Sequence, residues 1–222
     1  DAARDAGAWV AVGVTERSRS DTLYNTVVYI GADGEIAGRH RKLVPTGAER
    51  LVWGNGNDHL LTVIEVGGVR VGSLICWENY MPLARMAMYE RGVDVLLAPT
   101  WDNSDEWVPT LRHIAKEGQI FVIGVTAFLR GSDVPRDLSG ADALYGGEDD
   151  FMSRGNTAIV RGVRIPKSAS VRYCAILLIS SCSARPLFTI LRPWDSSHAS
   201  TPPVNSAAKR WSRVCDEALI RL

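Results

Sequence analysis

Apolar runs alternate with helical patterns in the middle of this chain, and this order limits its fold more than any other feature. The sequence predicts strand, helix, strand, helix and strand at Val69–Cys76, Pro82–Arg91, Val93–Ala98, Pro109–Glu117 and Gln119–Thr126. The three strand-like runs are apolar at nearly every position, which is typical of strands buried on both faces. We therefore expect an α/β fold in which helices cover a sheet.

Further strands are predicted on both sides of this segment. They lie at Trp9–Glu16, at Leu23–Ile30, in a short stretch ending near Arg39, at His59–Val66 and at Arg154–Val160. Gly67 and Gly68 join two of the predicted strands, and a two-residue glycine linker suits a hairpin turn that needs positive φ. The segment Asp133–Asp150 is rich in Gly and Asp, so we expect a surface loop there. Beyond residue 161 we expect only a strand at Val171–Ile179 and a helix at Ser206–Ile220.

Charge divides the chain into two unlike parts. The 222 residues include 25 basic and 25 acidic residues. Residues 1–160 hold 15 basic and 22 acidic residues, a net charge of −7, whereas residues 161–222 hold 10 and 3, a net charge of +7. We therefore expect a domain at 1–160 and a separate C-terminal tail at 161–222.

Several classes of partner are disfavoured by composition and patterning. A balanced net charge gives no bulk electrostatic support for binding a nucleic acid. The longest apolar stretch, Cys174–Ser180, is far shorter than the roughly 20 residues that a membrane span needs. The first residues lack the basic and apolar regions of a secretory signal. We expect a cytoplasmic protein with no nucleic-acid or membrane partner.

Cys76 is the first candidate catalytic residue. It ends an apolar strand and precedes a helix, so it would lie at the carboxyl edge of the sheet, where α/β proteins place their ligands. A helix N-terminus also favours a thiolate, which is the nucleophilic form of cysteine. The alternative is that Cys76 is an inert, buried core residue.

Lys42 and Glu49 are the next candidates. Lys42 follows a predicted strand within the basic run Arg39–Lys42, and its positive charge could stabilise a reaction intermediate at a nearby thiolate. Glu49 could orient this lysine or act as an acid or base. The alternatives are that the basic run is a solvated edge and that Glu49 is an ordinary exposed residue.

The sequence offers no metal-ligand or nucleotide-binding motif. It contains no CxxC, HExxH, GxGxxG or Walker loop, and the three cysteines of the tail lack zinc-finger spacing. His113 lies on a predicted helix, where we expect it to pack or to donate a hydrogen bond rather than to bind a metal. We therefore expect cysteine chemistry that needs neither a metal nor a cofactor.

Five motifs in order resemble the nitrilase branch of the carbon–nitrogen hydrolase superfamily. They are RHRKLVPTGAERLVWG at Arg39–Gly54, LICWENYMP at Leu74–Pro82, LLAPTWDNS at Leu96–Ser104, HIAKEGQIF at His113–Phe121 and SRGNTAIV at Ser153–Val160. The resemblance covers about residues 1–160. It implies that Cys76 is the nucleophile, that Lys42 is the catalytic lysine and that Glu49 is the glutamate that supports it.

The resemblance also implies a fold and a reaction. The fold would be a four-layer αββα sandwich that associates through its outer helices into dimers or spirals. The reaction would be hydrolysis of a small nitrile to a carboxylic acid and ammonia through a thioimidate on the cysteine, without a cofactor. By the same resemblance we take Trp77, Glu78, Trp101 and His113 as candidate substrate-binding residues.

Two departures from the family pattern are apparent. The family's general-base glutamate belongs to a unit that should precede Asp1, and Glu16 has the wrong sequence context to replace it. The tail at 161–222 shows none of the family's motifs, which indicates a frame change, a fusion or an unfamiliar extension. We therefore expect an incomplete sandwich, truncated at its N-terminus.

Three other functions stay open at this point. The chain could be an amidase or a cyanide-hydrating relative, because the substrate range depends on loops and pocket residues. Without its general base it could be a non-catalytic remnant that binds a substrate or partner subunits. A cysteine-based redox sensor is a weaker alternative, since no second cysteine lies near Cys76 in the motif-bearing part.

Overall fold

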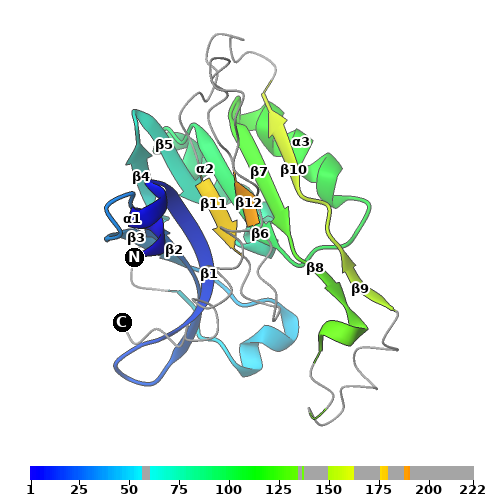
Figure 1. The fold of residues 1–222 in the computed structure, drawn as a ribbon. Helices are drawn as coiled ribbons and strands as arrows, with labels where there is room; N and C mark the ends of the chain where they lie inside the picture. The colour runs from blue at the N-terminus through cyan, green and yellow to red at the C-terminus, as the bar shows by residue number, and fades with distance from the viewer. Residues whose placement is uncertain (57–60, 135–136, 138–149, 163–175, 180–187, 191–222) are drawn as a thin grey trace, which may run out of the picture.

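Two β-sheets face each other in the computed structural model, which describes residues 1–56, 61–134, 137, 150–162, 176–179 and 188–190 (Figure 1). The first sheet runs, in spatial order, β12 (Phe188–Ile190), β11 (Ile176–Ile179), β1 (Trp9–Arg17), β2 (Leu23–Ile30) and β3 (Ile36–Arg41). The second sheet runs β10 (Ala158–Arg161), β7 (Phe121–Thr126), β6 (Val95–Thr100), β5 (Val69–Ser73) and β4 (Val63–Val66).

Short helices and a small ribbon complete the described elements. The helices and 3₁₀ turns are α1 (Ala2–Ala6), η1 (Gly47–Leu51), η2 (Cys76–Tyr80), α2 (Pro82–Glu90), α3 (Trp107–Gly118) and η3 (Gly131–Asp133). Strands β8 (Phe128–Arg130) and β9 (Phe151–Arg154) pair with each other and extend beyond the end of β7 (Figure 1).

Burial on both faces of the second sheet explains its continuous apolar runs. Along β6, Val95 and Leu97 point toward the first sheet, where they pack with Ala11, Val27 and Tyr29. The alternate residues of β6 point to the other side and pack against α2 and α3 with Met88, Leu111 and Ile114, among others. Side chains alternate between the two faces of a strand, so both layers of the core are supplied by one apolar run.

The arrangement confirms the predicted α/β fold and shows three layers of the expected αββα sandwich among the described residues. These layers are the first sheet, the second sheet and the helices α2 and α3. Strands β5, β6 and β7 are parallel, and α2 and α3 connect them as the alternating sequence pattern predicts. None of the described helices is long and apolar enough to cross a membrane.

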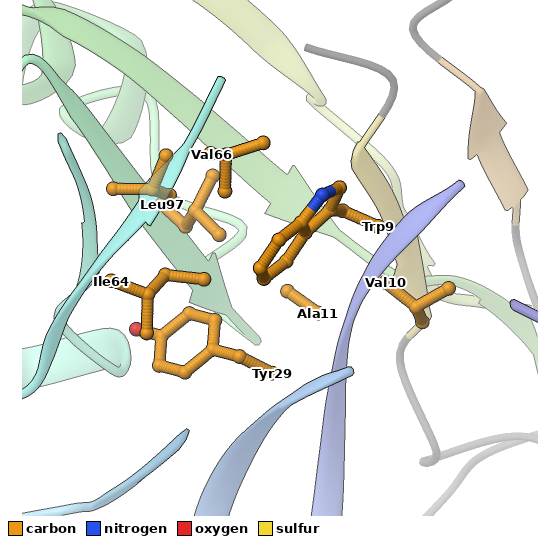
Figure 2. A pocket seen from close by; sticks show the side chains of 8 residues that line it. Trp9, Val10, Ala11, Tyr29, Ile64, Val66 and Leu97 are labelled. Carbon is orange, nitrogen blue, oxygen red and sulfur yellow. The ribbon is translucent and has the colours of Figure 1, made fainter. Parts of the chain in front are cut away.

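A small apolar pocket marks one end of the space between the sheets. Figure 2 shows the rings of Trp9 and Tyr29, from the first sheet, directed toward Ile64, Val66 and Leu97 of the second. The lining is apolar apart from the polar atoms of the two rings, so this pocket belongs to the hydrophobic core and does not include the predicted catalytic residues.

The predicted glycine hairpin is confirmed. Strands β4 and β5 pair in antiparallel register with Val66 opposite Val69, and the two glycines between them have φ of 57° and 81°. Positive φ at both central residues is the geometry of a type I′ turn, which most side chains disfavour.

Several predicted boundaries differ from the structure, and two of them have a clear physical reason. The sequence predicts that the apolar run at Val93–Ala98 ends before Pro99, but β6 continues to Thr100. Strand β5 pairs with β6 only as far as Leu97. Pro99 therefore lies beyond the end of β5, so the N–H that proline lacks is not needed for a hydrogen bond to that strand. The helix predicted from Pro109 begins two residues earlier, at Trp107, whose side chain is fully buried.

Some predictions fall on residues that the structure does not describe. The helix expected at Ser206–Ile220 and most of the loop expected at Asp133–Asp150 lie outside the described residues. The expected strand at Val171–Ile179 is described only in its last four residues, which form β11 and pair in parallel with β1.

Candidate active site

Cys76 lies where the chain leaves the second sheet. Strand β5 ends at Ser73, not at Cys76 as the sequence predicts, and Cys76 is instead the first residue of η2, which leads into α2. Because β5 and β6 are parallel, their carboxyl ends meet at the same edge of the sheet, which also places Trp101 there, directly after β6. Parallel α/β sheets bind ligands at this edge.

The backbone at Cys76 adopts a left-handed conformation. Its φ is 53°, a value that costs a non-glycine residue about 1–3 kcal/mol and that persists only where the surroundings hold it. Asn79 provides part of this support, since its Nδ2 donates to the carbonyl oxygens of Leu74 at 2.7 Å and of Cys76 at 2.9 Å. Cys76 is a free cysteine, and the residue is partly exposed.

The basic run at the end of β3 divides between the two faces of the first sheet. His40 and Lys42 point inward, toward the second sheet, and both are buried. Arg39 and Arg41 point outward and bond the carboxylate of Glu16 at 2.8 Å and 2.6 Å. The run is therefore not a solvated edge, because the period of two along a strand places alternate cations on opposite faces.

Lys42 and Glu49, which the sequence predicts as partners, form an ion pair. Lys42 Nζ lies 2.6 Å from Glu49 Oε2, and the lysine side chain is 0% exposed while that of the glutamate is 27% exposed. The same carboxylate oxygen accepts the backbone N–H of Thr46 at 2.6 Å, which caps η1 and fixes Glu49 in place. A buried ammonium with one carboxylate partner is a fixed positive charge of the kind that stabilises developing negative charge.

Glu78 lies beneath the turn that carries Cys76. Its side chain is 0% exposed, and Oε2 lies 2.8 Å from His40 Nε2. The backbone N–H of Leu43 donates to Oε1 at 2.7 Å, and that of Ile75 donates to Oε2 at 2.5 Å. The segments next to Lys42 and Cys76 are thus bonded to one carboxylate, which brings the two predicted catalytic residues to the same part of the molecule.

Two aromatic residues line the edge around Cys76. Trp77 is 53% exposed and packs against Tyr80 with a centroid distance of 4.9 Å, and Trp101 is 38% exposed. Tyr80 donates its hydroxyl to Asp102 Oδ2 at 2.6 Å and so links η2 to the loop after β6. Burial, together with the hydrogen bond to Asp102, raises the pKa of Tyr80 to about 12. Trp77 and Trp101 therefore lie at the same sheet edge as Cys76.

His113 is placed elsewhere. It lies on the exposed side of α3, and its Nε2 is 3.5 Å from Glu117 one helical turn on. Within the part of the chain that the structure describes, no hydrogen bond or ion pair joins His113 to the turn at Cys76. The same described residues contain no cluster of three or more His, Cys, Asp or Glu side chains that could hold a metal ion.

Sequence reasoning missed His40, Tyr80 and Asp102. His40 could have been found from the period of two, because it precedes Lys42 by two positions and must share its face. The link from Tyr80 to Asp102 has no signal in the sequence, since it joins two loops that meet only when β5 and β6 pair.

Comparison with known proteins identifies the family. Residues 1–162 match the family model described as carbon-nitrogen hydrolase. An aliphatic nitrilase from Sinorhizobium fredii is 44% identical over 159 residues, which are 72% of this chain and 50% of that protein. A bifunctional nitrilase/nitrile hydratase from Lupinus angustifolius is 45% identical over 127 residues, which are 57% of this chain and 36% of that protein. The chain spans about half the length, or less, of the curated relatives it matches.

Solved structures share the fold. A carbon-nitrogen hydrolase from Helicobacter pylori superposes with a TM-score of 0.60 at 21% identity, over 72% of this chain and 56% of that chain. An amidase from Nesterenkonia, with the acetamide moiety of fluoroacetamide added to its active-site cysteine, superposes with a TM-score of 0.50 at 24% identity, over 55% of this chain and 48% of that chain. The family match and the ordered motifs agree, and the chain belongs to the carbon–nitrogen hydrolase family, with curated relatives that are named nitrilases.

Proposed function

We propose that this protein hydrolyses a nitrile to a carboxylic acid and ammonia, with Cys76 as the nucleophile. The observation that carries the proposal is the strained turn that presents Cys76 at the sheet edge, bonded through one buried carboxylate to the segment of Lys42. The relatives named nitrilases support the choice of substrate.

The chemistry proceeds in two covalent stages. The thiol sulfur adds to the nitrile carbon and its proton goes to the nitrogen, which gives a thioimidate. Water then adds to this carbon, the C–N bond breaks and ammonia is released. A thioester on Cys76 remains. A second water breaks the C–S bond, which releases the acid and restores the thiol. Each nitrile thus consumes two water molecules.

Lys42 stabilises the negative charge that develops on the nitrile nitrogen and, later, on the oxygen of the tetrahedral species. Glu49 holds the ammonium at 2.6 Å, so it need not reorient during the reaction. Proton transfer to and from water also needs a general base. Glu16 does not fit this role, because its carboxylate lies on the outward face between Arg39 and Arg41.

Trp77 and Trp101 are proposed to contact the substituent of the nitrile, because both are exposed at the edge where Cys76 emerges. We assign no such contact to His113, which points outward from α3. No cofactor or metal is part of the proposal.

We also propose how copies of the protein associate and where its catalytic domain ends. Leu83 and Met86 on α2 are 85% and 52% exposed, which supports association of copies through the outer helices into a dimer or spiral. We propose that residues 1–160 form the catalytic domain of a cytoplasmic protein and that residues 161–222 are a tail without family resemblance, although its strands β11 and β12 join the first sheet.

The proposal is tested by incubating the full-length gene product with an aliphatic nitrile, an aromatic nitrile and the corresponding amides. We expect ammonia and acid from at least one nitrile, and none from the Cys76→Ala variant. The amidase with a similar fold makes amides the appropriate comparison. Release of ammonia from amides alone would contradict the nitrilase proposal and favour an amidase.

A further inference from the structure

We propose that Glu78 and His40 form a positioning pair that holds the nucleophile turn against the lysine strand. The proposal rests on the role of Cys76 given above, and it assigns Glu78 a role other than the predicted contact with substrate. Both side chains are 0% exposed, so neither presents a surface to a ligand.

The carboxylate of Glu78 is an acceptor shared by three N–H groups. Ile75 N–H and Leu43 N–H donate from the backbone, and His40 Nε2 lies 2.8 Å from Oε2. Both oxygens already accept a backbone N–H, and we assign the hydrogen of the third bond to His40 Nε2. Glu78 therefore accepts at both oxygens, and each bond reaches a different segment.

These three segments are the ones that the reaction requires. Ile75 precedes the nucleophile, Leu43 follows the lysine, and His40 lies on the same face of β3 as Lys42. The first segment belongs to the second sheet and the other two to the first sheet. One carboxylate thus fixes the relative position of Cys76 and Lys42 across the interface between the sheets.

A purely structural role would not demand this arrangement. Burying a carboxylate is costly unless it is fully bonded, and an apolar residue would fill the same core more cheaply. The two oxygens of a carboxylate in the middle of the interface instead fix both the distance between the two segments and their relative orientation. A nucleophile and its electrostatic partner need both to be fixed.

Glu16 offers a matched control. Its carboxylate is also buried, with its side chain 1% exposed, and it accepts bonds from Arg39, Arg41 and Thr26 on neighbouring strands. It lies on the outward face of the first sheet and takes no part in the proposed chemistry. Glu16→Gln and Glu78→Gln are thus the same change in two buried carboxylates that each have three partners, one on the outward face of the first sheet and one between the sheets.

The test measures the rate at which iodoacetamide alkylates each cysteine of the 222-residue chain, read peptide by peptide by mass spectrometry. We expect Glu78→Gln to slow alkylation of Cys76 by about 10- to 100-fold, the cost of a small misplacement of reacting groups. Glu16→Gln should leave that rate unchanged. Cys174, Cys182 and Cys215 serve as internal references in the same sample.

Histidine variants keep the test decisive if Glu78→Gln fails to fold. His40→Gln retains a donor at the Nε2 position and should keep the rate at Cys76 within about threefold of wild type, whereas His40→Leu should slow it as Glu78→Gln does. The proposal is overturned by an unchanged or faster rate at Cys76 in Glu78→Gln or His40→Leu, or by an equal loss in Glu16→Gln. Failure to hydrolyse nitriles would count against the proposed function and leave this comparison intact.

Discussion

Lys42 shows how a single residue acquires a function from its position on a strand. It follows β3 on the inward face, where its ammonium is buried and bonded to Glu49 at 2.6 Å. Its neighbours Arg39 and Arg41, of the same charge, face outward and are bonded to Glu16. All three residues carry the same charge, so charge does not distinguish them. Side chains alternate between the two faces of a strand, and this alternation places Lys42 inward and the two arginines outward.

The Lys42→Met variant tests the role of this charge. Methionine fills a similar volume without an ammonium, and the partner Glu49 is partly exposed, so the free energy of unfolding should change little. We expect the rate of reaction of Cys76 with a nitrile to fall by about 10²- to 10³-fold, as when an oxyanion donor is removed. Rapid-quench mass spectrometry measures that rate, and a rate equal to wild type would refute the assigned role.

At the scale of elements, the three strands β1, β2 and β3 are clamped together by one carboxylate. Glu16 of β1 accepts bonds from Thr26 of β2 at 2.9 Å and from Arg39 and Arg41 of β3. Burial alone would raise the pKa of Glu16, but the bonds from Arg41 and Thr26 and the charges of both arginines outweigh it, and the pKa lies below its ordinary value.

A pH dependence of stability follows from this clamp. The pKa of Glu16 is lower in the folded than in the unfolded state, so its contribution is complete above the ordinary pKa of 4.5 and is lost as pH falls through the folded-state pKa. We expect Glu16→Gln to lower the free energy of unfolding by about 1.5–3 kcal/mol at neutral pH, and by less in acid. Urea unfolding at pH 7 and pH 3.5 measures both values, and an equal loss at the two pH values would contradict the assignment.

Element types were largely predictable from the sequence, and element ends were not. The alternation of apolar runs with helical patterns was enough to predict the type and order of β5, α2, β6, α3 and β7, because each pattern reflects burial within a single element. The end of β6 at Thr100 depends on where the neighbouring β5 stops. The start of α3 depends on the burial of Trp107 in a pocket made by other elements.

At the scale of the whole molecule, the candidate site is assembled from both sheets. Cys76, Trp77 and Trp101 follow strands of the second sheet, whereas Lys42 follows the first, and Glu78 joins the two. Motif resemblance gave Cys76, Lys42 and Glu49 from the sequence alone. The place of His40 and the burial of Glu78 required the packing of one sheet on the other, which no local pattern encodes.

The central claim is that Cys76 adds to a nitrile, and the most direct test is the mass of the acid-quenched protein after incubation with benzonitrile. We expect a mass increase equal to one nitrile, or to one acyl group after loss of ammonia, located on the peptide that contains Cys76 and absent from Cys76→Ala. An unmodified Cys76 in a protein that still consumes the nitrile would show that Cys76 is not the nucleophile.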